Sequence, residues 1–197
     1  MTAQQPDPRQ QGEHDEGTVT MERAVPFEDE GGPHGQTIAA TLQAELFTRG
    51  QMIATAESLT GGELGVLLSA APGASDTYKG GVIAYDTSVK TGVLGVEQEI
   101  VDRFGVVSAE CAEAMARGVR VLLGTDLGVS TTGVAGPTAQ EGKPVGRVFV
   151  GVAGPQGVRS VRLELDGERA DIRARACLEA MTAAIQEVRA REVSGEE

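Results

Sequence analysis

Apolar side chains recur with helical spacing at both ends of the region that begins near residue 36. Ile38, Leu42 and Leu46 follow one another every four residues, and a glycine ends the run. This spacing puts the three side chains on one face, so it predicts an amphipathic helix over residues 36–50. A long final helix is predicted over residues 169–191.

Shorter apolar runs between these helices predict a sheet. The expected strands cover residues 51–56, 81–85, 127–132, 145–152 and 158–165. A helix is expected over residues 62–70, with Leu64, Leu67 and Leu68 turned inward. Another follows Ser108, a typical N-cap, and its apolar stripe comprises Ala112, Met115, Ala116, Val119 and Leu122. Because helices and strands alternate early and strands cluster late, the pattern favours an α/β fold, a three-layer α/β/α sandwich with a mixed, partly parallel sheet.

The first 35 residues differ from the rest of the chain. Their acidic residues outnumber their arginines by eight to two, and they hold four of the eight prolines. Such a segment buries too little apolar surface to offset the entropy lost on ordering, so residues 1–35 are predicted to be a disordered acidic tail. A docking arm or an autoinhibitor is the functional alternative. The folded domain is expected over residues 36–191, with a frayed end over 192–197.

Composition narrows the function classes. The chain has 197 residues, of which 40% are hydrophobic, and a formal net charge of -12. An acidic surface lacks the Lys and Arg that phosphate contacts need, which argues against nucleic acid and anionic membranes as partners. No apolar run approaches the roughly 20 residues of a membrane span, and no signal peptide is visible. Cys111 and Cys177 have no metal-ligand spacing and are expected to be reduced thiols of a cytoplasmic protein.

The stretch TAESLTGG, residues 55–62, is the first candidate for chemistry. Ser58 falls where a strand ends, and ligands collect at the carboxyl ends of strands in α/β sheets. The Thr-Gly-Gly that follows opens a helix, whose first N–H groups lack intrahelical partners and favour a phosphate or a developing oxyanion. Ser58 is therefore a candidate nucleophile. The structural alternative is that Ser58 or Thr60 is only an N-cap, and this stretch alone does not decide between the two.

A nucleophilic serine needs a base. His14 and His34 lie in or beside the predicted tail, which argues against a Ser-His-Asp triad and leaves a Ser-Lys arrangement. The segment GGVIAYDTSVK supplies Tyr85 at the end of a strand and Lys90 just beyond it. A desolvated lysine can act as a base, and a tyrosine hydroxyl can orient the proton. The alternative, which spacing alone favours, is that Tyr85 closes the core edge and Lys90 is a solvated helix residue.

Two further segments are candidates for ligand contact. TTGVAGP, residues 131–137, is a strand that ends in a Gly- and Thr-rich loop, which suits a phosphate or a ribose or else simply joins two strands. LDGERADIR, residues 165–173, carries Arg169 and Arg173 on one helix face. Two arginines so placed can grip a phosphate, or they can pair with nearby acidic residues.

These segments, in this order, resemble one family. The matching stretches are TAESLTGG, APGASDTYKGGVIAYDTSVK, GVVSAECAEAMARGVRVLLGTDLGVSTTGVAGP, KPVGRVFVG and LDGERADIRARA, which together cover roughly residues 36–190. The chain is thereby similar to the C-terminal domain of the competence/damage-inducible protein CinA, the nicotinamide mononucleotide deamidases. A pattern this long and in register is more specific than any single motif. The resemblance implies an α/β/α fold and hydrolysis of the carboxamide of nicotinamide mononucleotide, which gives nicotinate mononucleotide and ammonia.

The resemblance also implies roles for individual residues. Ser58 is the implied nucleophile, with Tyr85 and Lys90 as its catalytic companions, and backbone N–H groups over residues 60–62 are expected to hold the oxyanion. The residues expected to bind the nucleotide are Glu57, Thr60, Gly61, Gly62, Thr132, Gly133, Gly136 and Arg169. No metal or cofactor is expected. A homo-oligomer, a dimer, is expected by resemblance only.

The chain departs from the family's pattern close to these residues. The Gly-Pro at 136–137 is followed by Thr-Ala-Gln-Glu where many relatives carry a glycine cluster, so Glu141 adds a negative charge. Asp86 follows the tyrosine in place of the usual serine, and its charge is expected to raise the pKa of Lys90. Two other functions stay open: a catalytically weak relative that only binds nucleotide or a protein, and a serine hydrolase that acts on another small amide.

Overall fold

The computed structural model describes residues 32–190, so nearly all of the predicted acidic tail and the frayed end lie outside the described residues. The elements follow one another as α1 (Gly32–Thr48), β1 (Ile53–Glu57), α2 (Glu63–Ala70), α3 (Ala74–Thr77), β2 (Tyr78–Ile83), α4 (Thr87–Gly92), α5 (Gln98–Phe104), α6 (Ala109–Leu123), β3 (Leu127–Gly133), β4 (Arg147–Gly154), β5 (Gly157–Glu164) and α7 (Arg169–Ala190). Across residues 32–190, each helix is too short or too polar to cross a membrane.

The strands form one sheet in the order β2-β1-β3-β4-β5. β1 pairs in parallel with β2 and with β3, whereas β3–β4 and β4–β5 are antiparallel pairs. Glu57, the last residue of β1, lies in register with Ile83 of β2 and Thr131 of β3. The carboxyl ends of three parallel strands therefore meet at one edge, and the predicted mixed, partly parallel sheet is confirmed.

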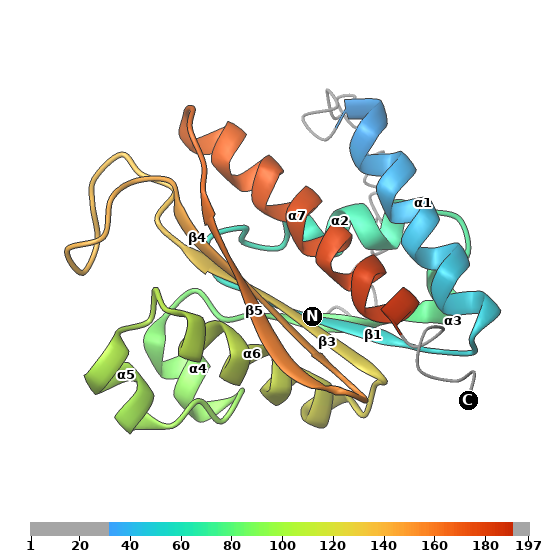
Figure 1. Cartoon of the computed structure of the whole chain (residues 1–197), viewed down its shortest axis with the longest axis horizontal. Coiled ribbons are helices and arrows are strands. Elements are labelled where there is room, and N and C mark those ends of the chain that lie inside the picture. The colour runs from blue at the N-terminus through green and yellow to red at the C-terminus, as the bar shows by residue number, and fades with distance from the viewer. Residues whose placement is uncertain (1–31, 191–197) are drawn as a thin grey trace, which may run out of the picture.

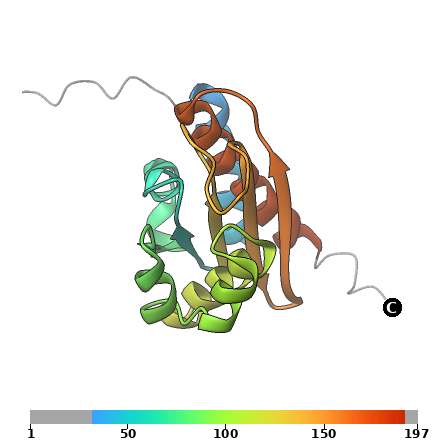
Figure 2. The same ribbon diagram turned by 90° about the vertical axis from the view of Figure 1, so that its left-hand side faces the viewer.

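Helices cover both faces of this sheet, with α1, α2 and α7 on one face and α4, α5 and α6 on the other (Figure 1). On the first face, Leu42 of α1 and Met181 of α7 pack in one core with Val150 of β4. On the second face, Met115 of α6 packs in another core that includes Ala54 of β1. Figure 2 shows the same arrangement from the side. The predicted three-layer α/β/α sandwich is confirmed.

Glycines allow α6 to lie directly on the sheet. A Cβ atom at Gly128 of β3 would meet the carbonyl oxygen of Ala116, and one at Gly151 of β4 would meet that of Ala112. The hydroxyl of Ser130 donates a hydrogen bond to the same Ala112 oxygen at 2.6 Å. The backbone of α6 thus contacts the backbone of the sheet, which leaves no room for larger side chains at these two positions.

Several boundaries differ from those predicted. α1 begins at Gly32 rather than near residue 36, so the last four residues of the predicted tail are helical. β2 ends at Ile83, and Tyr85 therefore lies beyond its strand. Leu122, expected in the apolar stripe of α6, is 50% exposed because Leu123 takes the inward position in the last turn. The short helices α3 and α5 were not expected, and a helix at α4 entered only through the interpretation of Lys90 as a helix residue, because four to seven residues are too few to show a helical period.

Candidate active site

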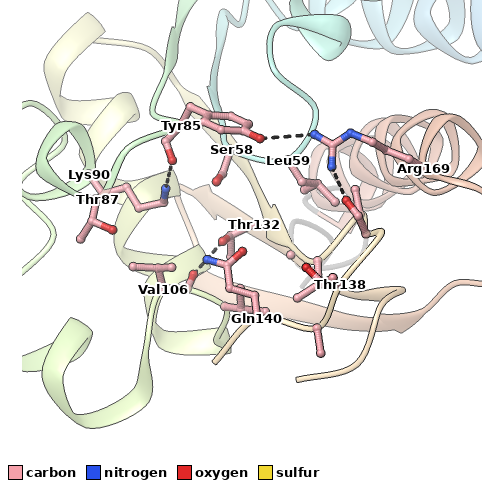
Figure 3. Close-up of a pocket in the computed structure, with 16 residues that line it drawn as sticks. Ser58, Leu59, Tyr85, Thr87, Lys90, Val106, Thr132, Thr138, Gln140 and Arg169 are labelled. Atoms are coloured by element: carbon pink, nitrogen blue, oxygen red, sulfur yellow. Dashed lines mark hydrogen bonds between the residues drawn. The ribbon is translucent and has the colours of Figure 1, made fainter. Parts of the chain in front are cut away.

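A cavity of about 300 Å³ lies beyond the carboxyl ends of β1, β2 and β3 (Figure 3). Chain segments far apart in the sequence contribute to its wall, from the turn after β1 to the first residue of α7. The predicted site residues that line it are Ser58, Tyr85, Lys90, Thr132, Gly133, Gly136 and Arg169. The fold therefore brings together the three predicted catalytic residues and four of those predicted to bind the nucleotide.

Ser58 is fixed by the end of the sheet. Its backbone N–H group donates to the carbonyl oxygen of Thr131 at 2.9 Å, which extends the parallel pairing of β1 and β3 by one residue. Among residues 32–190, the Ser58 hydroxyl has no hydrogen-bond partner, and it faces the cavity (Figure 3). A rigid backbone with a free hydroxyl suits a nucleophile that awaits its substrate.

Lys90 is a buried lysine, not a solvated one. It lies in α4, whose N-cap is Asp86, and its side chain is 1% exposed. The Nζ atom donates to the carbonyl oxygens of Ala84 at 2.6 Å and Tyr85 at 3.2 Å. Burial lowers the pKa of Lys90 below its usual value, because the charged form loses its hydration. The negative charge of Asp86 raises this pKa, as expected, but less than burial lowers it.

Tyr85 and Arg169 meet at the mouth of the cavity. Tyr85 is 63% exposed, and its hydroxyl accepts a hydrogen bond from the Arg169 guanidinium at 3.3 Å. The same guanidinium donates to the carbonyl oxygen of Gly136 at 2.7 Å. Figure 3 shows the Tyr85 hydroxyl turned toward Arg169 and away from Lys90. Arg169 thus bridges two loops that reach the cavity from different strands.

Glu57, Thr60, Gly61 and Gly62, which were expected to bind the nucleotide, are not among the residues that line this cavity, and their polar groups take part in hydrogen bonds of the turn after β1. The buried Glu57 carboxylate accepts hydrogen bonds from the Thr60 hydroxyl at 2.8 Å and the Gly62 N–H group at 2.9 Å. It also accepts from the N–H groups of Leu64 at 3.1 Å and Gly65 at 2.8 Å. The N–H group of Gly61 donates to the Ser58 carbonyl oxygen at 3.2 Å.

The first turn of α2 is therefore an anion site that the chain's own carboxylate fills. The Glu57 carboxylate thereby holds the turn that carries Ser58. Of the N–H groups over residues 60–62 that were expected to hold an oxyanion, those of Gly61 and Gly62 already donate within the turn. Arg173, the second arginine of the predicted pair, is also engaged, because it donates to the Thr60 carbonyl oxygen at 2.9 Å and forms an ion pair with Glu63 at 3.0 Å.

The sequence did not reveal two parts of the wall. One is the turn before α6, where Val106 and Val107 line the cavity. The Thr132 hydroxyl donates to the Val106 carbonyl oxygen at 2.6 Å and so ties this turn to β3. The other is the loop of Thr138, Ala139 and Gln140, whose only signal was its departure from the family's glycine cluster. In the part of the chain that the structure describes, no three His, Cys, Asp or Glu residues are grouped to hold a metal ion.

An α/β sandwich that gathers a serine, a buried lysine and an arginine around one cavity at its strand ends is typical of proteins that bind a small polar molecule. Comparison with known proteins narrows this class. The family model of the CinA C-terminal domain matches residues 35–188. The chain therefore belongs to the family of CinA C-terminal domains, and the resemblance found in the sequence is confirmed.

Similar chains come from several bacteria. A CinA-like protein of Synechocystis sp. is 49% identical over 148 residues, which are 75% of this chain and 36% of that protein. A CinA-like protein of Gemmatimonas aurantiaca is 45% identical over 166 residues, which are 82% of this chain and 39% of that protein. The chain thus spans less than half the length of these relatives.

Solved structures share the fold over nearly their whole length. A CinA superfamily protein from Klebsiella pneumoniae superposes with a TM-score of 0.77 at 29% identity, covering 79% of this chain and 98% of that one. The competence/damage inducible protein CihA from Agrobacterium tumefaciens gives a TM-score of 0.74 at 30% identity, covering 77% and 94%.

Proposed function

We propose that this chain is an amidohydrolase that converts nicotinamide mononucleotide to nicotinate mononucleotide and ammonia, with Ser58 as its nucleophile. The observation that carries the proposal is the buried Lys90, which lines the same cavity as the free Ser58 hydroxyl and has a lowered pKa. A serine needs such a base, and the described residues offer no histidine in this cavity. Membership of the CinA C-terminal domain family supports the reaction class.

In the proposed reaction, Ser58 Oγ attacks the carboxamide carbon while neutral Lys90 takes the hydroxyl proton. A C–O bond forms, and the carbonyl electron pair moves onto the oxygen. When the tetrahedral intermediate collapses, the C–N bond breaks, and Lys90 passes the proton to the nitrogen, which leaves as ammonia. Water then attacks the acyl carbon while neutral Lys90 takes one of its protons, and the bond to Ser58 breaks as the serine oxygen takes this proton from Lys90.

The contacts of Lys90 suit this role. Its Nζ atom donates to the carbonyl oxygens of Ala84 and Tyr85, so two of its bonding directions are fixed. A neutral amine held in this way keeps its lone pair for a third direction. Because the Tyr85 hydroxyl is bonded to Arg169, we propose direct transfer between Ser58 and Lys90. Tyr85 and Arg169 then form the rim of the cavity over the nucleotide.

Two of the N–H groups expected to hold the oxyanion are engaged elsewhere, so we also propose a donor outside residues 60–62. Gly61 and Gly62 already donate their N–H groups within the turn. Leu59 lines the cavity directly after the nucleophile, and its N–H group is the donor that we propose. One donor aimed at a developing oxyanion typically lowers a barrier by roughly 3 kcal/mol.

A binding protein without catalysis is the second candidate. The observation that favours it is the Glu57 carboxylate, which occupies the first turn of α2 and reduces the N–H groups left for an oxyanion. A serine hydrolase acting on another small amide is the third, since the loop at 138–141 departs from the family's pattern.

The test is ammonia release from nicotinamide mononucleotide by the purified chain, beside the Ser58→Ala and Lys90→Met variants. Ammonia from the wild type and none from either variant is the expected result. Ammonia from Ser58→Ala at the wild-type rate overturns the nucleophile. If the folded wild type releases no ammonia but binds the nucleotide in calorimetry, the result favours the second candidate, a binding protein without catalysis. A panel of other small amides tests the third.

Two further expectations belong to this proposal. A nucleotide salvage reaction suits a cytoplasmic protein, and the family resemblance suggests a homodimer. Fractionation of cells that express the full chain tests the first, and light scattering in solution tests the second.

A further inference from the structure

One wall of the cavity is a tight hairpin formed by residues 140–143. Gln140 and Lys143 exchange two backbone hydrogen bonds, with N to O distances of 3.2 and 2.8 Å. The two residues between them, Glu141 and Gly142, have φ angles of 52° and 70°. Positive φ at both central positions is the mark of a type I′ turn, a conformation that suits Gly, Asn and Asp.

Glu141 is therefore in a left-handed conformation that costs free energy for a residue with a Cβ atom. Such strain persists where the surroundings hold the residue in place. Here the side chain supplies the reason, because the Glu141 carboxylate accepts hydrogen bonds from the N–H groups of Val106 and Val107, both at 3.2 Å. Lys143 strengthens the attachment, since its Nζ atom lies 3.5 Å from this carboxylate and donates to the Phe104 carbonyl oxygen at 2.8 Å.

The segment before α6 is shaped to receive this carboxylate. A Cβ atom at Gly105 would overlap the Glu141 carboxylate, so only a glycine leaves the space that it fills. The φ angle of Gly105 is 80°, which exposes the next two N–H groups to the same acceptor. The side chains of Glu141 and Lys143 thus attach the hairpin to the backbone of residues 104–107.

This attachment controls which side chain faces the cavity. Gln140 lies next to Glu141 in the hairpin, and its amide group points into the cavity (Figure 3). Within residues 32–190, this amide group has no hydrogen-bond partner, so its donor and its acceptor are both free for a ligand. An amide presents the same pair of groups as a primary carboxamide and can bond one reciprocally.

We propose that Glu141 is a positioning residue, a latch that fixes the hairpin over residues 104–107 so that Gln140 can contact the carboxamide-bearing substrate. The inference rests on the proposed function for the identity of that substrate. The latch itself rests only on the contacts of Glu141. Gln140 is the residue that touches the ligand, and Glu141 acts through it.

The charge of Glu141 has a second consequence for the site. The ionisable groups that face Lys90 are Asp86 from the N-cap of α4, Cys111 from α6 and Glu141 from the hairpin, and Glu141 raises the pKa of Lys90. Removing this charge therefore lowers that pKa further. The neutral form of Lys90 then exists at lower pH, so the acidic limb of kcat/KM shifts to lower pH, an effect that lost packing alone does not produce.

The first experiment measures the latch without any substrate. Amide hydrogen exchange is followed at Val106 and Val107 in wild type, Glu141→Gln, Glu141→Gly and the matched control Glu99→Gln, which removes an exposed carboxylate of α5. Glu141→Gly relieves the left-handed strain and so keeps the fold. We expect exchange to accelerate by about tenfold or more in both Glu141 variants and to stay unchanged in the control. Unchanged exchange in Glu141→Gly overturns the latch.

The second experiment measures positioning. Binding of nicotinamide mononucleotide is titrated calorimetrically in the Ser58→Ala background, alone and combined with Glu141→Gly or Gln140→Ala. Each of these second substitutions is expected to raise the dissociation constant by about tenfold, which corresponds to the loss of one good hydrogen bond to the ligand. Gln140→Ala should leave the exchange of Val106 and Val107 unchanged. Faster exchange in Glu141→Gly with undiminished binding overturns the positioning role.

The same variants separate this inference from the proposed function. If neither Ser58→Ala nor the combined variants bind nicotinamide mononucleotide, the substrate assignment fails, and so does the role of Gln140 toward that substrate. The hydrogen-exchange rates of Val106 and Val107 still show whether Glu141 holds the hairpin in place. If wild type releases ammonia, Glu141→Gln is expected to shift the acidic limb of kcat/KM to lower pH, and Glu99→Gln to leave it in place. If the acidic limb of kcat/KM does not shift in Glu141→Gln, the proposed effect of the Glu141 charge on the pKa of Lys90 is overturned.

Discussion

The Nζ atom of Lys90 donates a hydrogen bond to the carbonyl oxygen of Ala84 at 2.6 Å, although the lysine side chain is 1% exposed. This contact joins α4 to the turn after β2 and holds the amine at the boundary between core and cavity. Burial makes the ammonium form costly, and carbonyl oxygens supply the only direct hydrogen-bond acceptors found for it among residues 32–190. The protonation of Lys90 therefore links the proposed chemistry to the stability of the fold.

The pH dependence of activity should follow from this burial. A general base works in its neutral form, and the pKa of Lys90 lies below the ordinary value of 10.5. We expect kcat/KM for nicotinamide mononucleotide to rise with pH along a limb that ends below that value. The measurement is a pH–rate profile in buffers of constant ionic strength. A limb at or above the ordinary lysine value would count against Lys90 as the base.

Stability should depend on pH in the same direction. Because the pKa of Lys90 is lower in the folded chain than in the unfolded chain, the unfolded state binds more protons between the two values. The free energy of unfolding then increases as pH rises from the folded pKa toward 10.5, and the burial penalty is fully present below that window. Urea unfolding of wild type and Lys90→Met across this range measures it. The wild type should gain stability relative to Lys90→Met as pH rises.

The buried Glu57 carboxylate should contribute strongly to stability. Its two oxygens accept from one hydroxyl and three N–H groups, and a glutamine has only one acceptor oxygen. We expect Glu57→Gln to lower the free energy of unfolding by about 3 kcal/mol, because buried donors lose an ionised acceptor. The exposed Glu179 of α7 offers the matched change, and Glu179→Gln should stay within about 0.5 kcal/mol of wild type. Equal effects of the two changes would contradict the role of Glu57.

The sequence predicts the layers because they depend on periodicity. The spacing of Ile38, Leu42 and Leu46 and the alternating strands follow from side chains that must face one core. Periodicity does not predict the short helix α4. Its six residues follow the N-cap Asp86, and Lys90 is the residue that they bury. Burial of Lys90 is consequently a tertiary property, and spacing alone favoured the opposite interpretation.

The candidate site likewise has parts that the sequence predicts and parts that depend on tertiary structure. Ser58 and Gly133 could be placed at strand ends because ligands collect there in parallel sheets. The role of Glu57 could not be deduced, since a carboxylate beside a helix N-terminus can face a ligand or fold back onto the helix. Its four acceptor contacts depend on the rotamer and on the turn over residues 60–62. The place of Gln140 in the cavity wall could not be predicted either, because it depends on the hairpin over residues 140–143. That hairpin requires a left-handed conformation at Glu141, which glutamate does not favour.

Close packing between α6 and the sheet gives a test of the fold. A Cβ atom at Gly151 would overlap the Ala112 carbonyl oxygen, which is backbone and cannot move aside. We expect Gly151→Ala to lower the free energy of unfolding by about 2–3 kcal/mol, as overpacking usually does. Gly92, the last residue of α4, has open space around its Cα atom and is the matched control. Gly92→Ala should be neutral or stabilise by up to about 1 kcal/mol, and thermal unfolding compares the two.

Arg169 should recognise the phosphate of the nucleotide. Its guanidinium lies at the mouth of the cavity, where it donates to the Tyr85 hydroxyl and the Gly136 carbonyl oxygen. A phosphate would replace or share these neutral acceptors, because charge-assisted hydrogen bonds are stronger. We expect Arg169→Ala to raise KM for nicotinamide mononucleotide by about 10- to 100-fold with a smaller effect on kcat.

A substrate without the phosphate separates recognition from local structure. Turnover of nicotinamide riboside should be much less sensitive to Arg169→Ala, since the group that the arginine binds is already missing. Arg175→Ala removes the same charge from an exposed position on α7 and should leave both substrates unaffected. If Arg169→Ala raises KM equally for both substrates, the arginine acts by holding Tyr85 and the loop at Gly136 in place.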